Sequence, residues 1–288
     1  MENGSAMAAP NANAEEQGLF PAPLPRRYMN WIGRRLILLT QTIHSLGAFA
    51  LITIGVTLTK FNVSPRVIHP LIRSMIYRAG VRLLPIVAFI AFALGLVIIG
   101  QTVALLSRVG ATNYAGIVMV TVVVRELGPL VTALLVLTRI GTAIVVELGT
   151  ARALGEVEAL EALGIDPIHF LVMPRVLGLA ISIFALTVYL ILLALLSGYL
   201  FLFIQDVPLR PGDYFAQLAG ALRWEDFVLL ALKTFAFGSI IATVTCYQGL
   251  ARPLRLEEVS NATTRAVVDS VVLCILLDAL FIVIYLVM

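Results

Sequence analysis

Long apolar segments alternate with short polar ones along this chain. An α-helix needs about 20 apolar residues to cross the hydrocarbon core of a bilayer. We expect five membrane spans, at residues 83–107, 115–146, 168–204, 227–249 and 266–287. The composition agrees, because 60% of the residues are hydrophobic and 13% are charged, which is unlike a soluble domain. The sequence therefore predicts an all-α integral membrane protein with a five-span domain over residues 83–288.

The N-terminal part of the chain is more polar. Residues 1–27 are rich in Ala, Asn, Pro and Glu and lack the basic start and apolar core of a signal peptide, so we expect a disordered tail. Residues 36–58 are long enough to span, but Gln, His, Ser and Thr interrupt them, which favours an interfacial helix over a true span. Arginines recur among apolar residues from 65 to 82. Residues 28–82 are therefore expected to form interfacial and elbow helices.

The basic residues give an orientation. Most of the 20 lysines and arginines lie before residue 83 or beside the expected loops 147–166 and 250–264. Cytoplasmic loops of membrane proteins carry an excess of such residues, so we expect a cytoplasmic N-terminus and a C-terminus on the other side. The formal net charge of +3 is small, and this distribution indicates a membrane surface rather than nucleic-acid binding.

Charged residues inside the expected spans are candidates for function, because an isolated charge at bilayer depth costs several kcal/mol. The second span also contains Arg139, and Pro129 is expected to kink it. Two interpretations remain open: a structural ion network that fixes helix register, or a polar site that grips a charged headgroup or couples helix movement to an energy source. The four candidates, whose charges sum to zero, are Arg125, Glu126, Lys233 and Asp278.

The stretch from 147 to 166 is too polar to span and has a helical pattern. Leu154, Val157 and Leu160 share one face, and Arg152 is placed to pair with Glu156 at i, i+4. A loop helix packed on its own bundle is one interpretation, and a docking helix for a soluble partner is the other. The docking set comprises Glu147, Arg152, Glu156, Glu158, Glu161 and Asp166.

Several classes of function are disfavoured. A phosphate-binding loop needs Gly-Lys-Ser/Thr, but the only lysines, Lys60 and Lys233, follow Thr59 and Leu232. The histidines and the two cysteines lack metal-ligand spacing, and no GxSxG motif for a nucleophile occurs. We therefore expect no catalytic residue, no metal and no cofactor in this chain.

Four segments resemble the MlaE-type permeases, the membrane subunits of ABC lipid transporters. They are RELGPLVTALLVLTRIGTAIVVELGT (125–150), EVEALEALGIDPIHFLVMPRVLG (156–178), CYQGL (246–250) and NATTRAVVDS (261–270). The resemblance covers roughly residues 60–288. The segment 152–155 departs from the family pattern, which affects the contacts expected of the docking helix.

The resemblance implies an assembly. It implies a homodimer in the inner membrane of a Gram-negative bacterium, with a coupling helix at about 150–166 that docks on an ABC ATPase subunit holding ATP and Mg²⁺. It further implies a STAS-domain protein on that ATPase and a periplasmic ring of MCE-domain proteins. Phospholipid would pass between the inner membrane and the ring, which maintains the lipid asymmetry of the outer membrane. Spans one and five are expected to contact the lipid tails.

Two rival functions remain. The chain could be a stand-alone channel or ion-coupled carrier that uses Glu126 or Asp278 as a proton site. It could also be an intramembrane enzyme that acts on lipids. Transport without nucleotide would favour the carrier, and covalent turnover of lipid would favour the enzyme.

Overall fold

The computed structural model describes residues 44–57, 59, 65–111, 114–204, 211–250 and 255–287. Every regular element in these ranges is a helix, with no strand among them, which confirms the all-α fold. Residues 1–47 and 48–288 form two units, and the packing described below is that of the second. The expected tail and the first part of the expected interfacial segment lie outside the described residues.

Five helices are long and apolar enough to cross a membrane, as the hydrophobic pattern predicts. A shorter apolar helix, His44–Thr57, precedes them. Helical structure often continues past the apolar run into polar residues, most of all in the first span, which includes the expected elbow at 65–82. The five are Pro65–Arg108, Ala115–Ala153, Ile168–Ile204, Trp224–Leu250 and Leu256–Val287.

Most of these spans are composite, since short π- or 3-10-helical segments join their α-helical parts. One π-helical segment, η4, ends at Leu127, two residues before Pro129, which has no N–H to donate. In chain order the elements are α2 (Pro65–Ala79), η1 (Val81–Leu83), α3 (Leu84–Leu94), η2 (Gly95–Ile99), α4 (Gly100–Arg108), α5 (Ala115–Met119), η4 (Val120–Leu127), α6 (Gly128–Val136), η5 (Leu137–Gly141), α7 (Thr142–Ala153), α8 (Glu156–Ala162), η6 (Ile168–Val172), α9 (Met173–Ile204), α10 (Pro211–Ala221), α11 (Trp224–Leu250), η7 (Leu256–Glu258) and α12 (Val259–Val287).

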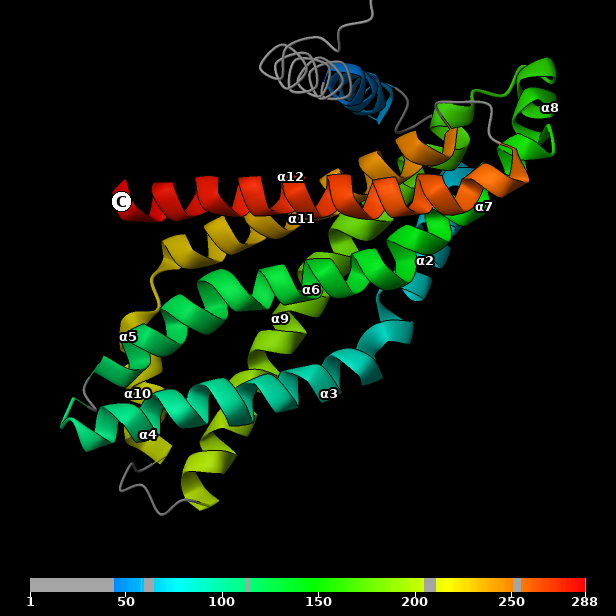
Figure 1. The fold of residues 1–288 in the computed structure, drawn as a ribbon. Helices are drawn as coiled ribbons and strands as arrows, with labels where there is room; N and C mark the ends of the chain where they lie inside the picture. The colour runs from blue at the N-terminus through cyan, green and yellow to red at the C-terminus, as the bar shows by residue number, and fades with distance from the viewer. Residues whose placement is uncertain are drawn as a thin grey trace, which may run out of the picture. The chain divides into compact units, whose positions relative to one another are not determined.

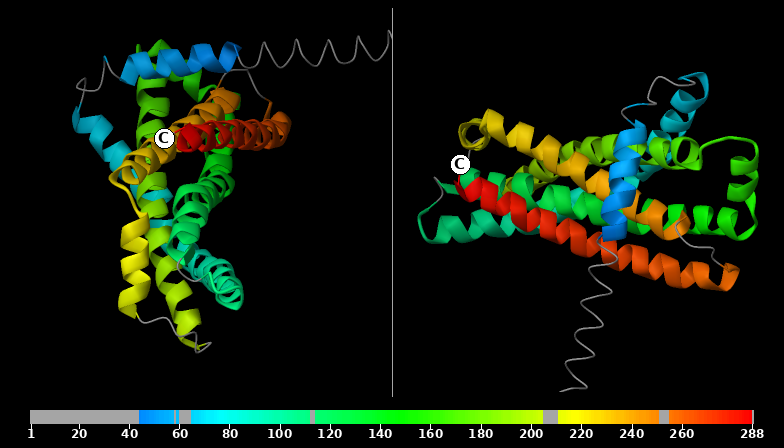
Figure 2. Two further views of the ribbon diagram at one scale, coloured as in Figure 1. Left: turned by 90° about the vertical axis from the view of Figure 1, so that its left-hand side faces the viewer. Right: turned by 90° about the horizontal axis from the view of Figure 1, so that it is seen from above.

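Helix α9 is central to the packing of these spans (Figures 1 and 2). It packs against α2, α3, α6 and α11, and 50% of the most apolar part of its span is buried, against 22% for the last span. Small residues allow close approach: a Cβ added at Gly238 on α11 would lie 2.5 Å from the Cα of Ala180 on α9. Helix α12 packs on α11 and α7, and its low burial leaves most of its apolar surface for lipid or a partner.

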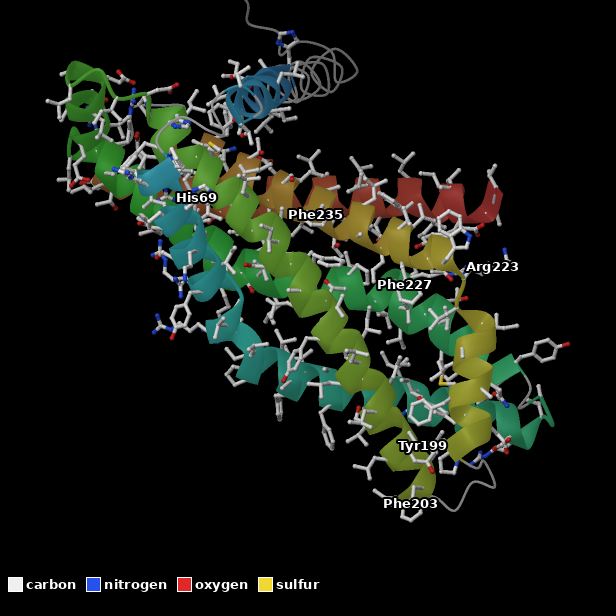
Figure 3. The ribbon with its side chains drawn as sticks, turned by 180° about the vertical axis from the view of Figure 1, so that it is seen from behind. His69, Tyr199, Phe203, Arg223, Phe227 and Phe235 are labelled. Carbon is white, nitrogen blue, oxygen red and sulfur yellow. The ribbon has the colours of Figure 1, made fainter. Side chains whose placement is uncertain are left out.

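The second unit has two distinct ends, which we call the α8 end and the α10 end after the short helices that lie there (Figure 1). At the α10 end, α10 packs on α5, and the Tyr214 hydroxyl donates a hydrogen bond of 2.9 Å to the carbonyl of Leu195. Burial raises the pKa of Tyr214, which keeps the phenol a neutral donor. Figure 3 shows Tyr199 and Phe203 on the last turns of α9 at this end, and His69 on α2 toward the other.

Candidate functional site

A fully buried lysine joins three helices inside the bundle. The Nζ atom of Lys233, on α11, lies 2.9 Å from Oε2 of Glu126 on η4 and 2.6 Å from Oδ1 of Asp278 on α12. It also donates a hydrogen bond of 2.8 Å to the carbonyl oxygen of Arg125. An ammonium has three N–H donors, of which two form hydrogen bonds to Glu126 and to this carbonyl, while Asp278 adds an ion pair. We call Glu126, Lys233 and Asp278 the lysine triad.

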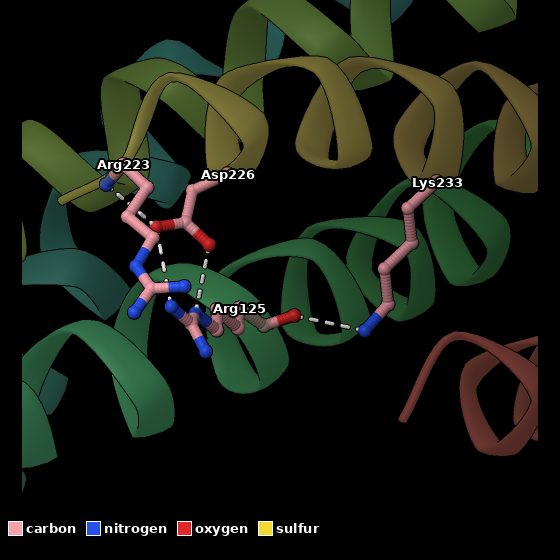
Figure 4. Close-up of polar contacts among 4 residues, drawn as sticks. All are labelled: Arg125, Arg223, Asp226 and Lys233. Atoms are coloured by element: carbon pink, nitrogen blue, oxygen red, sulfur yellow. Dashed lines mark hydrogen bonds and ion pairs between the residues drawn. The ribbon is translucent and has the colours of Figure 1, made fainter. Parts of the chain in front are cut away.

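Arg125 turns to a different carboxylate. Its Nε lies 2.9 Å from Oδ1 of Asp226, and its terminal NH2 group donates a hydrogen bond of 3.2 Å to Oδ2. Asp226 also accepts a hydrogen bond of 2.9 Å from the backbone N–H of Arg223, as Figure 4 shows. The guanidinium carbon of Arg125 lies 5.0 Å from the centre of the Tyr285 ring, within the range of a cation–π contact. We call Arg125, Asp226 and Tyr285 the arginine layer.

The lysine triad and the arginine layer are stacked along the same three helices. Asp226 and Lys233 are seven residues apart on α11, and Asp278 and Tyr285 are seven apart on α12, so each pair lies on one face about two turns apart. The neighbours Arg125 and Glu126 on η4 supply one residue to each layer. The layers together fix the register of η4, α11 and α12.

The four predicted intramembrane charges therefore do not form one cluster. Lys233, Glu126 and Asp278 meet, whereas the side chain of Arg125 pairs with Asp226. Neither Asp226 nor Tyr285 is among the residues that the sequence pattern singled out. An acid in the first turn of a helix is usually a capping residue, and only the three-dimensional register brings Asp226 to an arginine 101 residues away.

The acidic helix is shorter than its sequence pattern predicts. Helix α7 ends at Ala153, and α8 spans only Glu156–Ala162. Gly155 before it and Gly164 after it have φ angles of 77° and 75°, a left-handed conformation that favours glycine and ends a helix. The expected face of 151–163 is thus broken: Val157 is buried, whereas Leu154 is 62% exposed.

The predicted docking residues separate into two groups. Glu156, Glu158 and Glu161 project from α8 and are exposed. The expected pairing of Arg152 with Glu156 is wrong, because the turn at 154–155 brings Arg152 to Glu158 instead, at 3.1 Å.

Two other residues of the set lie away from α8 and bind within the bundle. The Oδ1 atom of Asp166 accepts a hydrogen bond of 3.0 Å from the backbone N–H of Ile168, at the start of η6. Glu147, on α7, pairs with Arg175 on α9 at 3.2 Å and with Arg78 on α2 at 3.6 Å. Glu147 thus joins α7 to α2 and α9 while its side chain stays 47% exposed, and Asp166 caps the start of η6.

Comparisons with known proteins agree on one class. The sequence profile of the family described as Permease MlaE matches residues 72–284. A "Probable ABC transporter permease protein" of Rickettsia felis is 30% identical over 247 residues, which cover 86% of this chain and 93% of that protein. The "Intermembrane phospholipid transport system permease protein MlaE" of Haemophilus influenzae is 27% identical over 73% of this chain and 80% of its own length. "Protein TRIGALACTOSYLDIACYLGLYCEROL 1, chloroplastic" of Arabidopsis thaliana is 30% identical over 68% of this chain and 55% of its own length.

Proposed function

Since this chain belongs to the MlaE permease family and is a multi-pass permease subunit of an ABC transporter, we propose that the cargo it moves is phospholipid. The name of the Haemophilus influenzae relative supports this cargo. Permease subunits of ABC transporters are generally non-catalytic, so ATP and Mg²⁺ would bind to a separate ATPase. The chain would act as a homodimer in the inner membrane of a Gram-negative bacterium and supply lipid to, or take it from, a periplasmic ring of MCE-domain proteins. There it would maintain the lipid asymmetry of the outer membrane, with a STAS-domain protein on the ATPase.

The second span is a continuous helical stretch, and this observation supports transmission of movement from α8 to the lysine triad. Ala115–Ala153 is one helical stretch that holds Arg125 and Glu126 near one end and reaches the turn before α8 at the other. ATPase movement against α8 would shift this rod, and the rod would shift the lysine triad against α11 and α12. Since α12 is the least buried span, its displacement would change the surface that contacts lipid.

The same geometry argues against the ion-coupled carrier. A carrier of this kind needs a carboxylate that can exchange its proton with water. Glu126 and Asp278 are each already engaged by the buried Nζ of Lys233, at 2.9 Å and 2.6 Å, in a contact that joins three helices. The two carboxylates are therefore better suited to holding helices together than to carrying protons.

Reconstitution tests the proposal. The chain and its ATPase would be purified together, placed in proteoliposomes with a fluorescent phospholipid, and assayed for lipid movement with ATP and with a non-hydrolysable analogue. We expect movement that requires ATP hydrolysis and is lost with Lys233→Met. Full-rate movement of lipid or ions by this chain alone, without ATPase, would overturn the proposal.

A further inference from the structure

A basic cavity of about 370 Å³ lies at the α8 side of the first two spans. Its polar lining comes from Arg78 at the end of α2, Arg82 in η1, Arg139 in η5 and Glu147 in α7. The chain turns at Gly80 between α2 and η1, so the cavity lies where the elbow meets the first span. The lysine triad and the arginine layer contribute no residue to it.

The cavity has more positive than negative charge, and that charge is accessible. Three guanidinium groups face one carboxylate, which is already shared with Arg175 at 3.2 Å and lies 3.6 Å from Arg78. Neither Arg82 nor Arg139 forms an ion pair with any residue that the structure describes, and both are exposed. A binding partner for this cavity should therefore be an anion.

The position of Arg139 is a second reason to expect an anion in the cavity. It lies within the second span, where an arginine without a counter-charge is costly unless it reaches water or a negative group. The function proposed above makes no use of Arg139. A negative group in the cavity would satisfy Arg139 and Arg82 together.

The rest of the lining is apolar, which favours an amphiphilic anion. Leu83, Ile86, Ile140 and Ile144 complete the wall. Three residues after Ile86 on α3, Phe89 is 76% exposed, and this spacing places both side chains on one face of the helix. An acyl chain could follow that face from the cavity toward the middle of the span.

We propose that this cavity binds the phosphate of an anionic phospholipid headgroup, at a site separate from the lysine triad. Arginine forms paired, charge-assisted hydrogen bonds with phosphate oxygens, and basic pockets between membrane helices bind anionic headgroups. The inference does not depend on the proposed cargo, because such a lipid can bind a protein that transports something else. Occupancy would place a phosphate beside Glu147 on α7, the helix that leads to α8, and the phosphate would compete with Glu147 for Arg78 on α2.

Ligand-dependent stabilisation of the full chain tests the site. The chain, purified in detergent and stripped of lipid, would be titrated with dioleoyl phosphatidylglycerol, dioleoyl phosphatidylcholine or inorganic phosphate while its thermal unfolding is followed. A ligand that binds only the folded state raises the unfolding midpoint. We expect phosphatidylglycerol to raise it at concentrations where the other two do not.

Matched variants assign the effect to the cavity. Arg82→Gln combined with Arg139→Gln should weaken the apparent affinity for phosphatidylglycerol by about tenfold or more, because two charged donors are lost. Arg73→Gln, an exposed residue of α2 outside the cavity lining, should leave the affinity unchanged. The single variant Arg82→Gln removes an exposed charge and supplies the test should the double variant not fold.

Three outcomes would overturn the proposal. Equal affinity in the wild type and in the cavity variants would place the lipid elsewhere. An equal response to inorganic phosphate would indicate a site for a soluble anion. Unchanged lipid binding together with loss of a co-purifying protein would show that the cavity binds an acidic protein segment.

Discussion

The charged side chains of the lysine triad and of helix α8 differ in burial and in pairing. Lys233 is 0% exposed, and its ammonium lies against three oxygens from two other segments. On α8, Glu156, Glu158 and Glu161 are exposed, and the ion pair from Glu158 to Arg152 involves a carboxylate side chain that is 51% exposed. Charge in the first region is satisfied within the chain, whereas charge in the second remains available to a partner.

The contrast shows which region can move. Removing one partner of a buried ion pair leaves an uncompensated charge in an apolar setting, so the buried region resists change. Exposed ion pairs contribute about 0–1 kcal/mol each, and the glycines at 155 and 164 allow the chain to turn on both sides of α8. Substitutions in the buried region should therefore cost more folding free energy than substitutions on α8.

Loss of the lysine should cost the most. Lys233→Met leaves Glu126 and Asp278 without their cation, and we expect the free energy of unfolding to fall by about 3–5 kcal/mol. The double variant Lys233→Met with Asp278→Asn removes one stranded carboxylate and should recover part of the loss. Denaturant unfolding in detergent micelles measures both, and equal stability of the two variants would contradict the pairing.

The arginine layer should be less critical, because Arg125 is 23% exposed. Arg125→Gln removes the ion pair to Asp226 and the contact with Tyr285, and we expect a loss of about 2 kcal/mol. Arg125→Lys keeps the charge but not the fork that reaches both carboxylate oxygens, so its loss should be intermediate. If Arg125→Lys were as destabilised as Arg125→Gln, charge would not be the main contribution.

The lysine triad and the arginine layer also show how much of the site could be predicted from the sequence. Apolar length predicted the five spans, and the cost of charge in a membrane singled out Arg125, Glu126, Lys233 and Asp278. Which charge meets which depends on the register between η4, α11 and α12, and residue spacing within one helix does not give that register. Sequence spacing alone could not show that Arg125 pairs with Asp226 while Lys233 pairs with Glu126 and Asp278.

At α8 the missed signal was local. The expected face of Leu154, Val157 and Leu160 assumed an unbroken helix through Gly155. A glycine after a helical turn commonly ends a helix in the left-handed conformation, so Gly155 could have indicated the break. The break explains why Arg152 reaches Glu158 and why Leu154 is exposed.

The turn itself should have a moderate effect. Gly155→Ala adds a side chain that meets nothing within 4 Å, so the cost comes only from the positive φ, about 1–2 kcal/mol. Gly220→Ala, inside α10 and equally free of contacts, should instead be neutral or stabilising. Hydrogen exchange of the amides of α8 in the two variants measures the difference, and equal protection would argue against strain at Gly155.

Charge reversal on α8 should have the smallest effect on folding and a large one on assembly. Replacing Glu156, Glu158 and Glu161 by lysine changes exposed side chains only. The free energy of unfolding should therefore change by no more than about 0.5 kcal/mol. Binding of the ATPase should fall by about tenfold or more, because like charges then oppose basic groups expected on the ATPase surface. Asp213→Lys, an exposed acid in the first turn of α10 at the opposite end, is the control and should leave binding intact. Pull-down with the tagged chain measures both variants, and full recovery of the ATPase with the triple variant would show that the exposed acids of α8 do not dock it.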